Sequence, residues 1–189
     1  MIKMADLFPH PGGETRETIG VTIRSGASIL GGMLELHYEL RANPGESLPG
    51  VFQDLPPLRV DRKSELWKEI CFEAFLPARD RESYVEFNGA MNGDWDLYHF
   101  DSYRSGMRRV PCEVDASPRL LSREGGGSLF RIAFSLPESL FSGLGALGPI
   151  GLTTVLKTET GTTYWALNHK GMKPDFHLRS SFLYDPIRN

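Results

Sequence analysis

The feature that most constrains the fold of this 189-residue chain is a repeated alternation of apolar and polar residues in short runs. In "MLELHYEL", residues 33–40, the leucines and the tyrosine fall on one side, and Glu35, His37 and Glu39 fall on the other. This period of two is expected of a strand with one buried face. Seven similar runs follow the same pattern, so about eight strands are expected in total. These runs are IGVTIRS (19–25), CFEAFL (71–76), YVEFN (84–88), DWDLYHF (94–100), LFRIAFSL (129–136), LTTVLKT (152–158) and TYWAL (163–167).

Helical signals are scarce. "DRKSELWKEI" (61–70) and "PESLFSGL" (137–144) could each supply a turn or two, which is short of the average helix of ~11 residues. Many short strands with few helices predict an all-β, antiparallel β-sandwich with short helical turns. The length favours a single domain over residues 1–189, and the Pro/Gly-rich segment 41–63 is expected to be a long surface loop.

Charge and composition disfavour several classes of function. The formal net charge of −3 and the pI near 6.0 leave no broad basic face for nucleic acid. No segment approaches the ~20 apolar residues that cross a bilayer, so no membrane association is expected and the predicted location is cytoplasmic. Cys71 and Cys112 lack C-x-x-C spacing, and Cys71 is expected to be a small buried side chain.

Two clusters of charged residues stand out against the strands. One is "NHKGMKPDFHLRSSF" (168–182), where Gly171 and Pro174 indicate a loop, and the other is "HFDSYRSGMRR" (99–109). Because the loops of a sandwich gather at its ends, we expect these two segments to meet. Phe176 is expected to anchor the first segment.

Three segments of the chain, taken together, resemble a known superfamily. They are LWKEICFEAFLPARDRESYVEFNGAMNGDWDLYHFDSYRSGMR (66–108), FRIAFSLPESLF (130–141) and GLTTVLKTETGTTYWALNHKGMKPDFHLRSSF (151–182). Their order and spacing resemble the DOMON-like superfamily, in particular carbohydrate-binding module family 9 and its stand-alone bacterial relatives. The resemblance implies a two-sheet, jelly-roll β-sandwich that binds a small ligand without catalysing a reaction. That ligand is a sugar in the carbohydrate-binding modules and haem b in some other DOMON domains.

The predicted function is therefore non-catalytic binding of a small molecule, a saccharide or glycan fragment. Aromatic faces would stack on the sugar, and charged loop residues would bind its hydroxyl groups. Each aromatic residue has the alternative of belonging to the core, and Asp175 has the alternative of a structural ion pair with Arg104 or Arg179. The predicted ligand-binding residues are Trp67, Trp95, Tyr98, His99, Asp101, Tyr103, Arg104, Arg108, His169, Lys173, Asp175, His177 and Arg179.

Other chemistries have weaker signals. No cofactor and no metal ion are expected. Two alternatives are haem b and a structural calcium ion. The available haem ligands are Met107, Met172, His99 and His169, and the available calcium ligands are Asp94, Asp96 and Glu86. "GLGALG" (143–148) matches a dinucleotide-binding pattern but runs into Pro149 instead of opening a helix.

Two further classes of function stay open beside ligand binding. A hydrolase would need two facing carboxylates, and Glu73 with Glu86 is the one acidic pair worth testing. A structural or protein-interaction sandwich would use its sheet edges or an exposed aromatic patch. The sequence leaves the oligomeric state undetermined. The positions of the tryptophans separate these alternatives, since tryptophans beside a polar cavity favour a ligand and tryptophans between the sheets favour a purely structural role.

Overall fold

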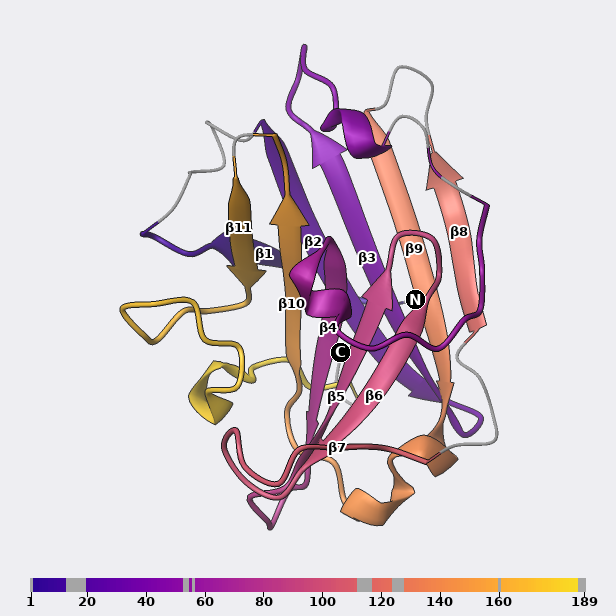
Figure 1. Cartoon of the computed structure of the whole chain (residues 1–189), viewed down its shortest axis with the longest axis vertical. Helices are drawn as coiled ribbons and strands as arrows, with labels where there is room; N and C mark the ends of the chain where they lie inside the picture. Colours follow the sequence, from indigo (N-terminus) through magenta and orange to yellow (C-terminus); the bar gives the residue numbers. More distant parts are fainter. Residues whose placement is uncertain are drawn as a thin grey trace.

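The protein is an all-β sandwich, as the alternating pattern predicts (Figure 1). The computed structural model describes residues 2–12, 20–52, 55, 57–111, 117–123, 128–159 and 161–186. Its strands are β1 (Ala5–Pro9), β2 (Val21–Leu30), β3 (Met33–Ala42), β4 (Cys71–Pro77), β5 (Tyr84–Ala90), β6 (Trp95–Phe100), β7 (Arg108–Arg109), β8 (Ser117–Arg123), β9 (Leu129–Pro137), β10 (Gly151–Lys157) and β11 (Thr162–Ala166).

Helical structure in the described residues is limited to 3-10 turns of three residues each. Three of them fall where short helical turns are predicted: η2 (Leu66–Lys68) and the consecutive η4 (Glu138–Leu140) and η5 (Ser142–Leu144). The remaining turns are η1 (Gly50–Phe52) and η6 (Arg179–Ser181). None of the helices in the described part of the chain has the length and apolar character needed to span a membrane.

The strands pair in one continuous antiparallel order, β7-β6-β5-β4-β10-β11-β1-β2-β3-β9-β8, which folds into two layers. We call β7, β6, β5, β4, β10 and β11 the front sheet and β2, β3, β9 and β8 the back sheet, as they lie in Figure 1. Strand β1 joins the two layers. Its first residues, Ala5–Leu7, pair with β2, and its last two, Phe8 and Pro9, pair with β11.

The main core lies between the two sheets. In β3 the predicted apolar face is fully buried, with Leu34, Leu36 and Leu40 at 0% exposure. Aromatic rings connect the layers: Phe72 of β4 lies 5.1 Å from the Tyr38 ring of β3, and Phe87 of β5 lies 5.0 Å from the Phe134 ring of β9. Burial of this apolar surface is the main term that holds the two layers together.

The front sheet also has a buried outer face, which faces away from the back sheet. In β4, Phe72 and Leu76 belong to the main core, whereas Glu73 and Phe75 point the other way. The same alternation in β6 puts Leu97 in the core and Phe100 outside, which separates the two faces of "DWDLYHF" as predicted. The smaller hydrophobic cluster on this outer face consists of Phe75, Tyr84, Tyr98, Phe100, Phe182, Trp67 and Phe176.

Three strands are absent from the sequence-based prediction. β1 is short and ends in a proline, β7 is a two-residue pairing with β6, and β8 pairs with β9 through a register shift near Leu120. None of the three has a long alternating run, so their pairing depends on the neighbouring strand. Cys71 is buried and reduced, as expected, whereas Cys112 lies outside the described residues.

Candidate functional site

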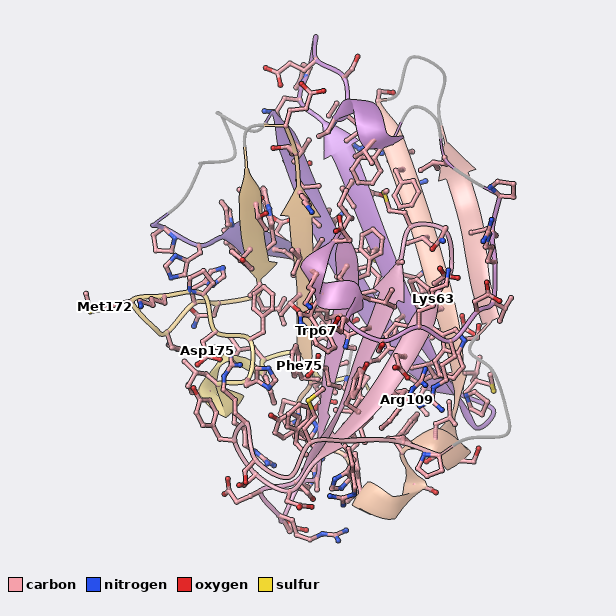
Figure 2. The ribbon with its side chains drawn as sticks, viewed as in Figure 1. Lys63, Trp67, Phe75, Arg109, Met172 and Asp175 are labelled. Carbon is pink, nitrogen blue, oxygen red and sulfur yellow. The ribbon has the colours of Figure 1, made fainter. Side chains whose placement is uncertain are left out.

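A cavity of about 390 Å³ opens on the outer face of the front sheet. Its floor is formed by β4, β5, β6, β10 and β11, and its rim is formed by η2, the loop 101–107 and the segment 174–177. In Figure 2, Trp67 and Phe75 lie over the middle of the front sheet with Asp175 beside them, whereas Met172 extends away from the molecule. The lining residues are Trp67, Glu73, Phe75, Glu86, Phe100, Arg104, Met107, Val155, Tyr164, Pro174, Phe176 and His177.

Two carboxylates from adjacent strands lie on the floor of this cavity. Glu73 is 2% exposed and Glu86 is 5% exposed. In the register of β4 and β5, Glu73 is opposite Asn88 and Glu86 is opposite Phe75, so the two glutamates are diagonal neighbours on one face. Glu73 accepts a hydrogen bond from Thr153 Oγ1 at 3.0 Å, and Glu86 accepts one from Asn88 Nδ2 at 2.8 Å.

Burial and mutual repulsion shift the titration of this pair. Removal from water and, to a smaller extent, the nearby Glu86 raise the pKa of Glu73 to about 8, against the hydrogen bond from Thr153. Burial likewise raises the pKa of Glu86 to about 7, while Asn88 and Arg104 oppose that rise. The pair therefore retains a proton at neutral pH, which is unusual for glutamates.

Asp175 connects the two charged segments that the sequence analysis expects to meet. Its carboxylate accepts hydrogen bonds from the Tyr103 hydroxyl at 2.5 Å and from Arg104 Nη2 at 2.9 Å. It also accepts the backbone N–H of His177 at 3.1 Å. Burial favours the neutral acid, but the hydrogen bonds from Tyr103 and Arg104 hold the pKa of Asp175 below its usual value. The predicted proximity of the two segments is confirmed, and Arg104 is the partner in the ion pair.

His177 points inward and contacts the floor. Its Nδ1 lies 2.7 Å from the Tyr84 hydroxyl, which also accepts the backbone N–H of Arg104. The single hydroxyl hydrogen of Tyr84 can therefore be donated to Nδ1, which places the imidazole proton on Nε2, 3.9 Å from Glu86 Oε2. Burial, helped by the charge of Arg104, lowers the pKa of His177 to about 4. The ring is neutral at physiological pH.

We call residues 168–182 the covering segment, because its aromatic residues close one side of the cavity. Phe176 packs against Phe75 and Tyr164, with ring centroids 6.5 and 6.0 Å apart. At its end Phe182 stacks on Phe75 at 5.6 Å and lies so close to Gly151 that a Cβ there would meet the ring at 2.6 Å. A glycine in β10 thus permits this segment to lie flat on the sheet.

The predicted ligand-binding residues divide into three groups. Trp67, Arg104 and His177 line the cavity. Tyr98, Tyr103 and Asp175 support those three: the Tyr98 ring packs on Trp67 at 5.5 Å, and Tyr103 and Asp175 hold the rim around Arg104. The remaining seven do not line this cavity and are Trp95, His99, Asp101, Arg108, His169, Lys173 and Arg179.

Trp95 and His99 face the side of β6 opposite to the cavity. Trp95 is fully buried in the main core, where Arg62 lies over its ring at 5.3 Å. His99 borders a separate surface groove together with Arg108. Alternation along the strand accounts for both, since only residues in phase with Phe100 face the cavity.

The other five residues have structural contacts or are exposed. Asp101 pairs with Arg108 at 2.7 Å on the surface. His169 lies 2.8 Å from the Phe8 carbonyl, and Arg179 donates hydrogen bonds to the carbonyls of Ala78 and Arg81. Lys173 is exposed. Of the predicted residues His177 and Arg179, only His177 lines the cavity. The guanidinium of Arg179 fixes the covering segment to the loop after β4.

The two glutamates are the main feature that the sequence-based site lacks. "CFEAF" and "YVEFN" each place one acid inside an otherwise apolar run, and a strand buried on both faces has no solvent-exposed side for such a residue. In the sequence-based prediction this pair is considered for a hydrolase and is not included among the ligand-binding residues. The other unpredicted lining residues are Phe75, Phe100, Met107, Val155, Tyr164 and Pro174.

The residues considered for metal and haem binding are dispersed. Within the described ranges, no group of three or more His, Cys, Asp and Glu side chains is arranged to hold a metal ion. Two of the three acids considered for calcium have cationic partners, since Asp94 pairs with Lys63 at 2.6 Å and Asp96 with Arg62 at 2.7 Å. The third, Glu86, lines the cavity. Of the four haem-ligand candidates only Met107 lines the cavity, and Met172 is fully exposed. The absence of a cofactor stays a prediction.

Comparison with known proteins shows a similar fold and identifies no family. No protein-family model matches the chain. No curated protein matches it either. Among solved structures, the fold is similar to that of a candidate carbohydrate-binding protein from Bacteroides uniformis ATCC 8492, with a TM-score of 0.64 and 13% sequence identity, covering 96% of this chain and 84% of that chain. At this identity the similarity shows a shared fold.

Proposed function

We propose that the protein binds a saccharide or glycan fragment in the cavity on the outer face of the front sheet. The observation that carries the proposal is the composition of the cavity wall. Five aromatic side chains surround a floor and rim that present two carboxylates, a guanidinium and an imidazole. Aromatic faces stack on the C–H faces of a sugar ring, and the polar groups can accept or donate hydrogen bonds to its hydroxyls.

Two independent similarities point in the same direction. The structural neighbour is described as a candidate carbohydrate-binding protein, and three segments of this chain resemble the DOMON-like superfamily and carbohydrate-binding module family 9. The positions of Trp67 and Trp165 bear on whether a tryptophan binds a ligand or belongs to the core. Trp67 lies at the cavity, as a ligand platform would, whereas Trp165 is fully buried and has a structural role.

The state of the two glutamates favours binding over hydrolysis. An acid-base pair for glycoside cleavage works when its surroundings push the two pKa values apart, so that one residue is protonated and the other ionised. Here burial raises the pKa of both Glu73 and Glu86 in the same direction. Neither carboxyl is fully ionised at neutral pH, so we propose a non-catalytic role.

The expected affinity is modest. The cavity is open to solvent at its rim, where Arg104 and Asp175 remain partly exposed. Each sugar hydroxyl therefore exchanges a hydrogen bond with water for one with the protein. We expect dissociation constants in the millimolar to micromolar range, or roughly −4 to −8 kcal/mol.

Tryptophan fluorescence provides a direct test. Of the three tryptophans, Trp95 and Trp165 are 0% exposed, so a soluble quencher reports mainly on Trp67. A glycan array should identify saccharides that bind, and calorimetry should give their affinities. Those saccharides should protect Trp67 from iodide quenching, and Trp67→Ala should weaken binding by roughly tenfold or more, as for an aromatic binding residue.

A matched pair of methionines controls for non-specific effects. Met107 lines the cavity, and Met172 is fully exposed on the covering segment. Met107→Ala should weaken saccharide binding, whereas Met172→Ala should leave it unchanged. If no saccharide on the array binds, or if bound saccharides leave Trp67 open to quenching, the proposal is wrong.

A further inference from the structure

We propose that the saccharide bound in this cavity carries a cationic amine, and that its ammonium group sits against Glu73 and Glu86. This inference rests on the proposed function and names the class of ligand, an amino sugar with a free amine. It distinguishes that class from neutral sugars and from N-acetylated sugars.

The first reason is the shortage of positive charge around the two carboxylates. Glu73 and Glu86 are almost completely buried and both line the cavity. Their hydrogen bonds come from Thr153 and Asn88, which are uncharged. Among the described lining residues the cationic side chain is Arg104, and it pairs with Asp175 at the rim. A buried carboxylate without a cation is costly, and a ligand that supplies one removes the cost.

The second reason is the contrast with the other buried acids of the front sheet. Asp94 and Asp96 each contact a cation of the protein itself, Lys63 at 2.6 Å and Arg62 at 2.7 Å. In Figure 2, Lys63 and Arg109 lie on the right of the view, whereas Asp175 lies on the left. The chain therefore supplies cations for its structural acids but not for the pair that faces the cavity.

The third reason is the aromatic wall. Phe75 and Phe100 come from strands that flank or carry the glutamates, and Phe176 closes the cavity from the covering segment. An ammonium group gains from the negative faces of aromatic rings as well as from carboxylates. A sugar hydroxyl can donate one hydrogen bond here, whereas an ammonium donates three and also supplies the missing charge.

Binding of a cation should be coupled to release of a proton. The titratable groups near the pair are Cys71 on β4, Tyr84 on β5, Tyr38 on β3, His177 and Arg104 from the rim, and the two glutamates themselves. Of these, the glutamates titrate near neutral pH, while His177 stays neutral and Arg104 stays charged. A cation stabilises the ionised carboxylates, so its binding expels protons, and a neutral ligand has no such effect.

The test uses three ligands that differ only at the second carbon of each sugar. They are the β-1,4-linked trisaccharides of glucosamine, N-acetylglucosamine and glucose, measured by calorimetry at pH 6 and pH 7 in two buffers with different ionisation enthalpies. The glucosamine trimer should bind roughly tenfold or more tightly than the glucose trimer, the gain expected for hydrogen bonds to a charged group. The buffer dependence should show proton release for the glucosamine trimer alone.

Variants locate the effect. Glu73→Gln and Glu86→Gln should each reduce the preference for the glucosamine trimer over the glucose trimer to within a few-fold. Glu69→Gln is the matched control, because Glu69 is exposed and pairs with Lys157 away from this cavity. It should leave the preference and the proton release unchanged.

The outcomes separate this inference from the proposed function. Equal affinity for the three trimers, a preference for the acetylated one, or a preference that survives both glutamate variants would overturn the inference and leave saccharide binding intact. If no trimer binds, benzylamine and benzyl alcohol serve as a matched non-sugar pair for the aromatic cavity. Glutamate-dependent binding of benzylamine alone would retain the cation site and reject saccharide binding, whereas no discrimination would overturn both.

Discussion

At the scale of single residues, the buried carboxylates show how a binding site can reduce the stability of the folded protein. Glu73 and Glu86 are raised in pKa because folding removes them from water and places them near each other. An unfolded glutamate, in contrast, ionises with a pKa near 4.5. The folded state thus holds protons that the unfolded state releases, and stability depends on pH through this difference.

We predict that the protein loses stability as the pH rises from about 4.5 to about 8. Between the unfolded pKa of 4.5 and the folded values of about 7 and 8, the folded state binds more protons, so unfolding becomes easier as the pH increases. His177 acts in the opposite sense, but only between pH 4 and 6.5, because its folded pKa is lowered. Thermal unfolding followed by circular dichroism measures the trend.

Glu73→Gln should flatten this pH profile. Glutamine keeps the shape of the neutral acid and cannot ionise, so the variant should be more stable than the parent at pH 8 by about 1–3 kcal/mol and similar at pH 5. Glu69→Gln is the exposed control and should keep the parental slope. A variant that shows the same slope as the parent would mean that Glu73 ionises normally in the folded protein.

At the scale of elements, the site depends on segments with little regular structure that lie against a regular sheet. The loop 101–107 and the covering segment are joined through Asp175, and the covering segment is fixed at its far end by Arg179 and Phe182. The front sheet supplies a buried outer surface because its central strands are buried on both faces. A strand with one polar face could not support this second layer.

Gly151→Ala should disturb the covering segment more than the sheet. The added Cβ would meet Cδ1 of Phe182 at 2.6 Å, so the ring has to move. Overpacking of this kind costs about 1–3 kcal/mol, and because Phe182 supports Phe75 below the cavity, ligand binding should weaken as well. Denaturant unfolding and calorimetry with the best saccharide measure both effects.

Gly143→Ala is the matched control for this change. No heavy atom would lie within 4 Å of a Cβ at Gly143, so that variant should keep both the stability and the binding of the parent. Equal behaviour of the two variants would show that the contact between Gly151 and Phe182 does not position the covering segment.

At the scale of the whole molecule, β1 ties the two sheets into one unit. It pairs with β2 of the back sheet and with β11 of the front sheet, so the strand order is continuous. Tyr184, near the C-terminus, adds a link by donating its hydroxyl hydrogen toward the carbonyls of Lys3 at 2.6 Å and Ala27 at 3.0 Å. We expect the sheets to unfold together.

Leu7→Ala tests this cooperativity. Leu7 lies in β1 and is fully buried in the main core, so its truncation should cost about 2–5 kcal/mol. The destabilised variant should still unfold in one transition, with tryptophan fluorescence and far-ultraviolet circular dichroism coinciding. Phe8→Ala in the same strand is the control, since Phe8 is 48% exposed and should cost much less. Separate transitions by the two probes would show that β1 does not couple the layers.

The sequence by itself determined the fold class and most of the strands. The alternation of apolar and polar residues in β3, β5 and β6 can be read from the sequence alone, because burial of every second side chain fixes which side of a strand faces the core. It also predicted that the segments around Arg104 and Asp175 meet, since loops of a sandwich gather at its ends. Both inferences depend on neighbours in the chain and on general rules of packing.

Only the tertiary structure decided which residues face the cavity. Trp95 and Trp67 are equally plausible ligand platforms in the sequence, but the phase of β6 puts Trp95 in the core, and η2 puts Trp67 over the outer face. Glu73 and Glu86 are thirteen positions apart in the chain and become a pair only through the register of β4 with β5. Register and the placement of loops depend on contacts between distant residues, and the properties of a binding site follow from those contacts.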